Sequence, residues 1–488
     1  MSFIFDDFQL LLRIYNKLHN FIIIYKHSMD GKIRILFYNL DGAGVNYFRT
    51  LTPATELDRN HSDEFYVEIN PQIDFNDPKF VDYLKTFHII HYHRQFLGDT
   101  KQMISLAAEL RKSGTILMAD IDDYWQLHKK HPFYAMNLEK KMHLPIIENL
   151  KIADYVTTTT DLFADEIRKI TGRDNVGVFY NSIDPTWMKQ FQDNRKPDPD
   201  GRVRITYMAG SSHMGDVEQL EGVMNVLYGD SQLKDKFKVI IAGWDTEGNT
   251  TDITFNQEFG DILQKKGLWT PQTIKIINSS RGDVDKIPKL SDEIKNKFRG
   301  KVFNQQQRDI KSNESVYLIY EKILTDNHHL IENPDYLQWL LNFERNVKYD
   351  NEGNFGRRWT QKANTYAQVL DETDIVIAPL ADNPFNRMKS NLKQVECWTR
   401  KLPIVCSDIP PYNIHGKHME NCVLIPAEKN ARKYWQKYLK RLILDADLRK
   451  QLGEQLYVDF KDEYNLATVT KKRADFYKAA VAKTLAVV

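Results

Sequence analysis

The sequence predicts an α/β protein with two doubly wound domains that face a cleft, and with a long insertion in the second domain. Two observations lead to this fold class. Short apolar runs alternate with amphipathic helical stretches along most of the chain, which is the pattern of consecutive β–α–β units. One polar stretch with prolines and a glycine, 191–202, interrupts this series and separates two halves that each open with a strand and a glycine-bearing turn.

The first half, residues 29–190, is expected to form the first domain. Its opening apolar run is predicted to be a buried parallel strand, because it is apolar almost throughout. A tight turn at Gly42 and Gly44 and a helix follow it. The amphipathic helix that starts at residue 100 is expected to end at Gly114. Strands are predicted at 32–40, 87–93 and 115–123, a helix–strand–helix segment at 146–172, and a closing segment at 175–184.

The second domain is expected to span residues 203–460. A polar insertion at 245–360 interrupts it, with helical stretches at 315–324 and 335–347. The last segment, 461–488, is predicted to be a helix that crosses back to the first domain. Strands are predicted at 203–212, 236–244, 373–380, 402–408 and 421–426.

Composition gives general limits on function. A formal net charge of +1 produces no strong overall field that would attract a polyanion. Three cysteines in 488 residues favour a reducing, cytoplasmic setting. Charged residues interrupt the apolar runs of residues 1–28, so this stretch is not expected to span a membrane, and its acidic start is unlike a signal peptide. A packing helix, a helix in peripheral contact with a membrane and a simple extension stay open for it.

The stretch after residue 379 carries the clearest functional signal. Lys389, Lys393 and Glu396 are spaced as on one face of a helix, directly after a predicted strand. Two ammonium groups near a helix start suit a diphosphate, and a carboxylate one turn further suits a ribose hydroxyl. A solvated charged face is the alternative. Ser390 is expected either to cap this helix or to contact a phosphate oxygen.

Several stretches together resemble the GT-B glycosyltransferases, specifically family 4 (group 1). They are GAGVNYFRTLTPATEL, ADYVTTTT, VFYNSID, YMAGSSHMGD and the segment 373–408. The family has two Rossmann-like domains and a signature of two glutamates separated by seven residues. Glu396 matches the second glutamate, whereas Met388 stands where the first would fall. Arg357, Trp359 and Tyr366 are similar to residues of phage-encoded members of this group.

The resemblance implies metal-independent transfer of a sugar, with retention at the anomeric carbon, from a UDP- or GDP-sugar to an acceptor hydroxyl, with no other cofactor. The second domain would hold the nucleotide. The implied catalytic residues are Lys389, His93 and Asp122, and Arg49, Arg94 and Asp123 are acceptor-side candidates. The implied donor-binding residues are Gly42, Gly44, Gly210, Ser211, His213, Asn386, Lys389, Ser390, Lys393 and Glu396.

Other interpretations stay open. Closely spaced aspartates at 120, 122 and 123 can bind Mg²⁺, act on the acceptor, or only cap a turn. The acceptor is a glycan, a lipid or a small molecule, or else a hydroxymethylated DNA base, as in phage DNA modification. Duplex DNA would need a basic groove, for which Arg299, Lys301, Arg308 and Lys311 are candidates. A non-catalytic protein that binds sugar nucleotides or glycans is the rival class. Composition does not fix the oligomeric state.

Overall fold

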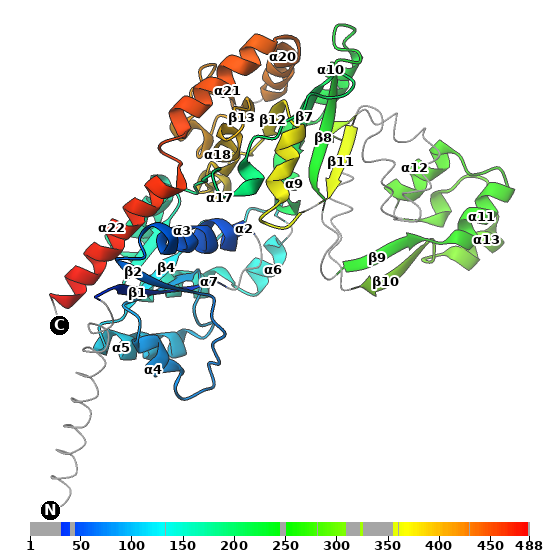
Figure 1. Cartoon of the computed structure of the whole chain (residues 1–488). Coiled ribbons are helices and arrows are strands. Elements are labelled where there is room, and N and C mark those ends of the chain that lie inside the picture. The colour runs from blue at the N-terminus through cyan, green and yellow to red at the C-terminus, as the bar shows by residue number, and fades with distance from the viewer. Residues whose placement is uncertain are drawn as a thin grey trace, which may run out of the picture.

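The computed structural model describes residues 31–39, 44–131, 133–244, 250–280, 282–308, 323–325, 355–359, 361–428 and 430–486. Two parallel six-stranded sheets, one in each half, are flanked by helices (Figure 1). Most strands are buried along their length, as expected where helices cover both faces of a parallel sheet. The predicted fold class is therefore confirmed. None of the helices among these residues is both long and apolar enough to span a membrane.

The first sheet has the strand order β2-β1-β3-β4-β5-β6, with all neighbours parallel. Its strands are β1 Ile33–Tyr38, β2 Phe65–Ile69, β3 Ile89–His93, β4 Ile116–Asp120, β5 Tyr155–Thr158 and β6 Val176–Val178. A π-helical turn, Tyr47–Leu51, interrupts the helical stretch after β1. The helices are α2 Gly44–Asn46, α3 Thr52–Asn60, α4 Phe80–Lys85, α5 Thr100–Lys112, α6 Tyr134–Glu139, α7 His143–Ile152 and α8 Asp161–Thr171.

The second sheet has the order β11-β8-β7-β12-β13-β14, again all parallel. Its strands are β7 Val203–Met208, β8 Phe237–Trp244, β11 Phe355–Trp359, β12 Ile375–Ala378, β13 Ile404–Ser407 and β14 Val423–Ile425. Its α-helices are α9 Met214–Val217, α10 Val223–Gly229, α17 Pro384–Arg387, α18 Leu392–Trp398, α19 Tyr412–His415, α20 Ala431–Leu444 and α21 Ala446–Phe460, and α22 Leu466–Leu485 follows them. Short 3₁₀ turns occur at Lys189–Phe191, Ser211–His213, Glu218–Leu220, Val284–Lys286 and Tyr366–Glu372.

Two edge strands differ from the sequence prediction. β2 was not predicted, because only one of its five residues is buried and its apolar pattern is correspondingly weak. β11 lies inside the predicted insertion but pairs with β8, so it belongs to the main sheet. The predicted helices at 315–324 and 335–347 lie outside the described residues, apart from residues 323 and 324, and residues 1–28 lie outside them as well.

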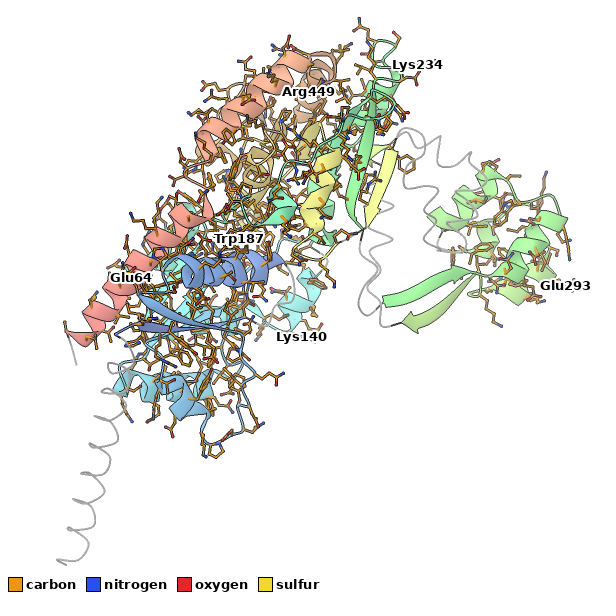
Figure 2. All side chains as sticks on the ribbon, viewed as in Figure 1. Glu64, Lys140, Trp187, Lys234, Glu293 and Arg449 are labelled. Atoms are coloured by element: carbon orange, nitrogen blue, oxygen red, sulfur yellow. The ribbon has the colours of Figure 1, made fainter. Side chains whose placement is uncertain are left out.

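Part of the insertion forms a small unit with its own apolar core. Strands β9 Thr250–Phe255 and β10 Phe303–Arg308 pair antiparallel, and α11 Gln257–Lys265, α12 Pro271–Ser279 and α13 Asp292–Phe298 lie beside them. Phe259 and Phe298 meet in its core. The unit projects from the second domain, where Figure 2 labels Glu293 on it.

The last helix, α22, packs on the first domain rather than the second. Its residues Tyr477 and Ala480 share an apolar cluster with Ile35 and Phe37 of β1. The Nζ atom of Lys478 lies 2.8 Å from a carboxylate oxygen of Glu64, which is labelled beside this helix in Figure 2. The two ends of the described chain are thus joined in one domain, and α22 ties the second half to the first.

A close backbone contact in the second domain yields a stability prediction. A Cβ atom on Gly453 of α21 would lie 1.9 Å from the carbonyl oxygen of Lys401, so Gly453→Ala must displace the helix or the turn before β13. We expect a loss of about 1–3 kcal/mol, as for other overpacked sites. Gly229→Ala, where a Cβ would meet nothing within 4 Å, is the matched control and should not destabilise. Denaturant melts of both variants check this, and equal melts would contradict it.

Candidate active site

The first domain presents a buried charged group at the carboxyl ends of β3 and β4. His93 and Asp120 are the last residues of these neighbouring strands and stand opposite each other in register. The π-helical turn brings in Arg49, which is fully buried and binds Asp120 through two hydrogen bonds of 3.0 and 2.6 Å. Arg49 also donates to the carbonyl oxygen of Phe179 at 2.6 Å. Arg49, predicted on the acceptor side, thus has its interactions within the domain.

His93 lies between two carboxylates. Its Nδ1 atom is 3.3 Å from Asp120 Oδ2, and its Nε2 atom is 3.3 Å from Asp122 Oδ1. Burial alone would lower the pKa of His93, but the negative charges of Asp122 and Asp120 outweigh it, so the pKa is raised. The pKa of Asp122 is lowered, since the attraction of His93 and Arg94 outweighs its burial. The two predicted catalytic residues of this domain therefore lie side by side, and the two carboxylates favour the charged form of the histidine.

His91, the other histidine of β3, has a different environment. Its Nε2 atom is 3.3 Å from the hydroxyl of Thr157, and its ring packs on Phe37 and Tyr477. Burial lowers the pKa of His91 to about 3, so this ring is neutral near pH 7. This environment is that of a core residue, in keeping with the sequence-based preference for His93.

Arg94 and Asp123 extend the group toward the second domain. Arg94 has a positive φ of 54°, which turns the chain sharply after β3. Its Nη2 atom lies 3.2 Å from Asp122 and 3.4 Å from Asp123. Asp123 in turn is 3.9 Å from the Nζ atom of Lys389, which comes from the second domain. The two sheets therefore direct opposite charges at each other across the domain boundary.

The sequence predicted one helix with Lys389, Lys393 and Glu396 on one face, and the predicted start of this helix is wrong. Lys389 lies in a turn between α17 and α18, because α18 begins only at Leu392 and has seven residues. Lys389 instead packs its ammonium group over the Phe385 ring, 4.8 Å from the centroid. The adjacent Ser390 accepts a hydrogen bond of 2.9 Å from Asn181 of the first domain, so its hydroxyl bridges the domains.

Lys393 and Glu396 are adjacent on α18. The Lys393 ammonium donates to Glu396 Oε2 at 2.8 Å, and Tyr366 donates to Glu396 Oε1 at 2.5 Å. Glu396 is only 1% exposed. Burial, followed by the charge of Glu396, raises the pKa of Tyr366 well above its ordinary value, so the phenol remains a donor. Tyr366 was singled out by the resemblance, and here it orients the predicted ribose ligand.

Asp216 of α9 anchors the loop before α17. Its Oδ1 atom accepts hydrogen bonds from the Ala381 amide at 2.8 Å and the Asn386 side chain at 2.7 Å. Its Oδ2 atom lies 2.8 Å from Nδ1 of His213. Burial, then the nearby Lys389, lower the pKa of His213. Asp216, which was not among the predicted site residues, thus links His213 to Asn386 close to Lys389.

For the remaining predicted residues, the structure gives a position in the chain but fewer side-chain contacts. Gly42 lies outside the described residues, and Gly44 is the first residue of α2. Gly210 directly precedes the 3₁₀ turn that begins at Ser211. In the insertion, Arg299 pairs with Asp285 at 2.9 Å, which offsets one of the cations considered for DNA. No group of three or more His, Cys, Asp or Glu side chains is arranged to hold a metal ion in the part of the chain that the structure describes.

Sequence reasoning missed two histidines of the loop after β4. The rings of His128 and His131 lie 5.8 and 5.6 Å from the Phe385 ring of the second domain. No motif marks them, because the contact depends on how the two domains meet. Their only sequence signal is their position after a strand end that carries aspartates.

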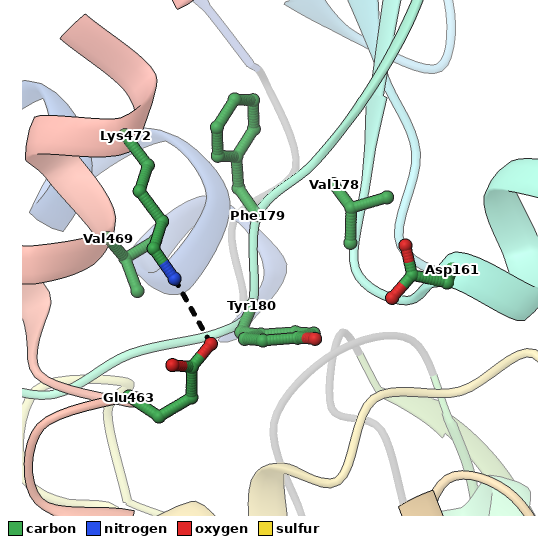
Figure 3. Close-up of a pocket in the computed structure, with 7 residues that line it drawn as sticks. All are labelled: Asp161, Val178, Phe179, Tyr180, Glu463, Val469 and Lys472. Carbon is green, nitrogen blue, oxygen red and sulfur yellow. Dashed lines mark hydrogen bonds and ion pairs between the residues drawn. The ribbon is translucent and has the colours of Figure 1, made fainter. Parts of the chain in front are cut away.

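A separate small pocket of about 160 Å³ lies where α22 starts (Figure 3). Tyr180 forms part of it, and Glu463 and Lys472 are paired at 3.1 Å on its wall. None of the predicted site residues lines this pocket. The candidate site is therefore the charged boundary between the two sheets, at the carboxyl ends of their strands, where ligands of doubly wound sheets usually bind.

Comparison with known proteins identifies the fold. No family model and no curated protein sequence matches the chain. A sucrose-phosphate synthase from Thermosynechococcus elongatus is similar in structure over 93% of this chain and 100% of its own, with 11% identity and a TM-score of 0.50. Anabaena HepE in complex with UDP-glucose aligns over 93% of this chain and 100% of its own, with 11% identity and a TM-score of 0.48. The likeness to the synthase confirms the GT-B arrangement of two Rossmann-like domains.

Proposed function

We propose that this protein is a glycosyltransferase that moves a sugar from a nucleoside-diphosphate sugar to an acceptor hydroxyl. One observation carries the proposal: the Nζ atom of Lys389 of the second domain lies 3.9 Å from Asp123 of the first, next in the chain to the Asp122 carboxylate that lies beside His93. Cations on one side and a histidine–carboxylate pair on the other are what a diphosphate leaving group and a hydroxyl acceptor require. The fold shared with a sucrose-phosphate synthase supports it.

The donor would lie on the second domain. Lys389, Lys393 and His213 are the groups we assign to the diphosphate, and Glu396 to the ribose. Glu396 can accept a ribose hydroxyl without losing Tyr366 or Lys393, because each carboxylate oxygen has two lone pairs. Gly210, Ser211, Asn386 and Ser390 would shape the same site, and Gly42 and Gly44 would approach it from the first domain.

The reaction we propose retains the anomeric configuration. Met388 packs against the core of the first domain and offers no carboxylate for a covalent intermediate. The acceptor oxygen would therefore attack the anomeric carbon from the same face from which the leaving group departs. The bond from the anomeric carbon to the phosphate oxygen breaks, the bond to the acceptor oxygen forms, and the acceptor proton passes to the departing phosphate. Lys389 and Lys393 would stabilise the charge on the diphosphate without a metal.

Donor binding is the first test. UDP- and GDP-sugars, screened against the full chain in the presence of EDTA, should include one series that raises the thermal midpoint. A ligand at a hundred times its Kd stabilises the folded state by about 2.7 kcal/mol. Glu396→Ala should abolish the shift, whereas Arg387→Ala, which removes an exposed cation paired with Asp382, should keep it. A shift that needs a divalent metal would contradict metal independence, and no shift with either series would contradict the proposed function.

The same ligands separate an enzyme from a sugar-nucleotide-binding protein. An enzyme should release nucleoside diphosphate from the stabilising donor when an acceptor extract is added. A protein that is stabilised by a donor but never releases nucleotide would be the non-catalytic alternative.

A further inference from the structure

His128 and His131 surround Phe385 together with Lys389. The two imidazole rings come from the first domain, and the Lys389 ammonium lies over the same phenylalanine, 4.8 Å from its centroid. Phe385 is 4% exposed, so it forms a buried centre for the three polar groups. The neighbouring Lys130 pairs with Glu218, which also holds this loop against the second domain. The histidines thus belong to the boundary where Lys389 meets the first domain.

Both rings use Nδ1 as an acceptor within their own loop. His128 Nδ1 accepts a hydrogen bond of 3.2 Å from the backbone N–H of Lys130, and His131 Nδ1 accepts one of 3.1 Å from Phe133. A nitrogen that accepts from an N–H carries no proton, so each neutral ring must carry its hydrogen on Nε2. Among the described residues no well-formed hydrogen bond reaches the buried Nε2 atom of His128, although the Ser212 backbone is close enough to act weakly on the pKa of this ring. The Nε2–H group is therefore available to an acceptor atom of a ligand.

The charges around the two rings favour their neutral form. Burial lowers the pKa of His128; Lys389 and Lys130 lower it further, and Asp216 opposes them. Burial lowers the pKa of His131 to about 4, assisted by His128, Lys389 and His213 and opposed by Asp123. Protonation would also break the bonds that Nδ1 accepts. The neutral form of both rings is thus favoured beside the Lys389 ammonium.

We propose that His128 and His131 belong to the donor site, where their Nε2–H groups donate hydrogen bonds to the diphosphate while both rings stay neutral. This inference rests on the proposed function. It assigns part of the diphosphate site to the first domain, so that donor binding holds the two domains together. An anionic ligand is favoured here because the Lys389 ammonium lies over the Phe385 ring that both imidazole rings contact, and phosphate oxygens accept hydrogen bonds from ammonium and Nε2–H donors alike.

Substitutions of His128 and His131 that keep or remove a donor near Nε2 test whether these groups bind the diphosphate. Glutamine places an amide N–H near the position of Nε2, whereas alanine removes the donor. His131→Ala and His128→Ala should each weaken binding of the UDP- or GDP-sugar identified in the thermal screen by about tenfold or more, the effect of losing a hydrogen bond to a charged group. His131→Gln and His128→Gln should stay within about threefold of the wild type. His143→Gln, a histidine of α7 with no part in this cluster, should bind normally.

Calorimetry in buffers of different ionisation enthalpy counts the protons taken up on binding. The wild type and the His128→Gln/His131→Gln double variant should take up equal numbers at pH 6.5–8, because neither ring gains a proton. If the wild type takes up protons on binding and the double variant does not, the rings become cations, and the assignment of neutral rings is overturned. Alanine variants that bind normally would overturn the site itself. Absence of nucleotide-sugar binding by the wild type would overturn the proposed function as well.

Discussion

Replacing Lys389 with alanine is expected to lower the rate of sugar transfer about a hundredfold, as loss of one group that stabilises developing negative charge commonly does. The Nζ atom lies 3.9 Å from Asp123 and above the buried Phe385 ring, so the charge is held in place before the substrate arrives. The negative charge on the leaving diphosphate grows toward the transition state. We therefore expect kcat to fall more than KM rises, measured as nucleotide release in steady state.

Arg387→Ala is the matched control for this prediction. Arg387 is two positions away, but its side chain is half exposed and pairs with Asp382 on the same loop. Its loss should change kcat less than threefold, because an exposed pair contributes little. Equal losses in both variants would mean that the loop, rather than the Lys389 ammonium, matters. Unchanged turnover in Lys389→Ala would refute its catalytic role.

Replacing Arg49 with methionine should destabilise the first domain by about 3–5 kcal/mol, the usual result of removing one partner from a buried ion pair. Arg49 is fully buried and Asp120 is 1% exposed, so the carboxylate would keep its charge without its main partner. The carbonyl of Phe179 would lose its donor as well. Burial opposes the charge of Asp120, but Arg49 and His93 together hold its pKa well below the ordinary value.

Hydrogen exchange across β3 and β4 measures this effect best, because a chain with two domains is not expected to unfold in one step. Protection of these strands should fall sharply in Arg49→Met. Arg387→Met, which removes an exposed pair, should cost at most about 1 kcal/mol. Protection of β3 and β4 that is equal in wild type and Arg49→Met would show that the ion pair does not support the sheet.

The central strands of both sheets could be predicted because burial on both faces leaves a nearly continuous apolar run. β1, β3, β12 and β13 all have this character. The strands β2 and β11 could not, since only one residue of β2 is fully buried and β11 carries two arginines, so neither shows a continuous apolar run. The start of α18 was misjudged because local spacing alone suggested a helix through Lys389. The chain there turns instead, with the Ser390 hydroxyl bonded to Asn181, a partner distant in sequence.

The candidate site shows the same division. Residues at strand ends, such as His93 and Asp122, could be selected because parallel strands place their carboxyl ends at one edge. His128 and His131 could not, since their contact with Phe385 arises only where loops of two domains meet. Asp216 could not, since its partners Ala381 and Asn386 are distant in the sequence. Several statements stay predictions: retention at the anomeric carbon, the identity of the acceptor, metal independence, a phage origin and a cytoplasmic location.

Hydrogen exchange of the full chain with a stabilising UDP- or GDP-sugar tests the central claim most directly, namely that the donor binds between the domains at Lys389. Protection should increase in two separate segments, 122–133 of the first domain and 384–398 of the second, with no change in α11 or α13 of the insertion. Protection confined to the insertion, or to the pocket around Tyr180 and Glu463, would place the ligand elsewhere and contradict the account.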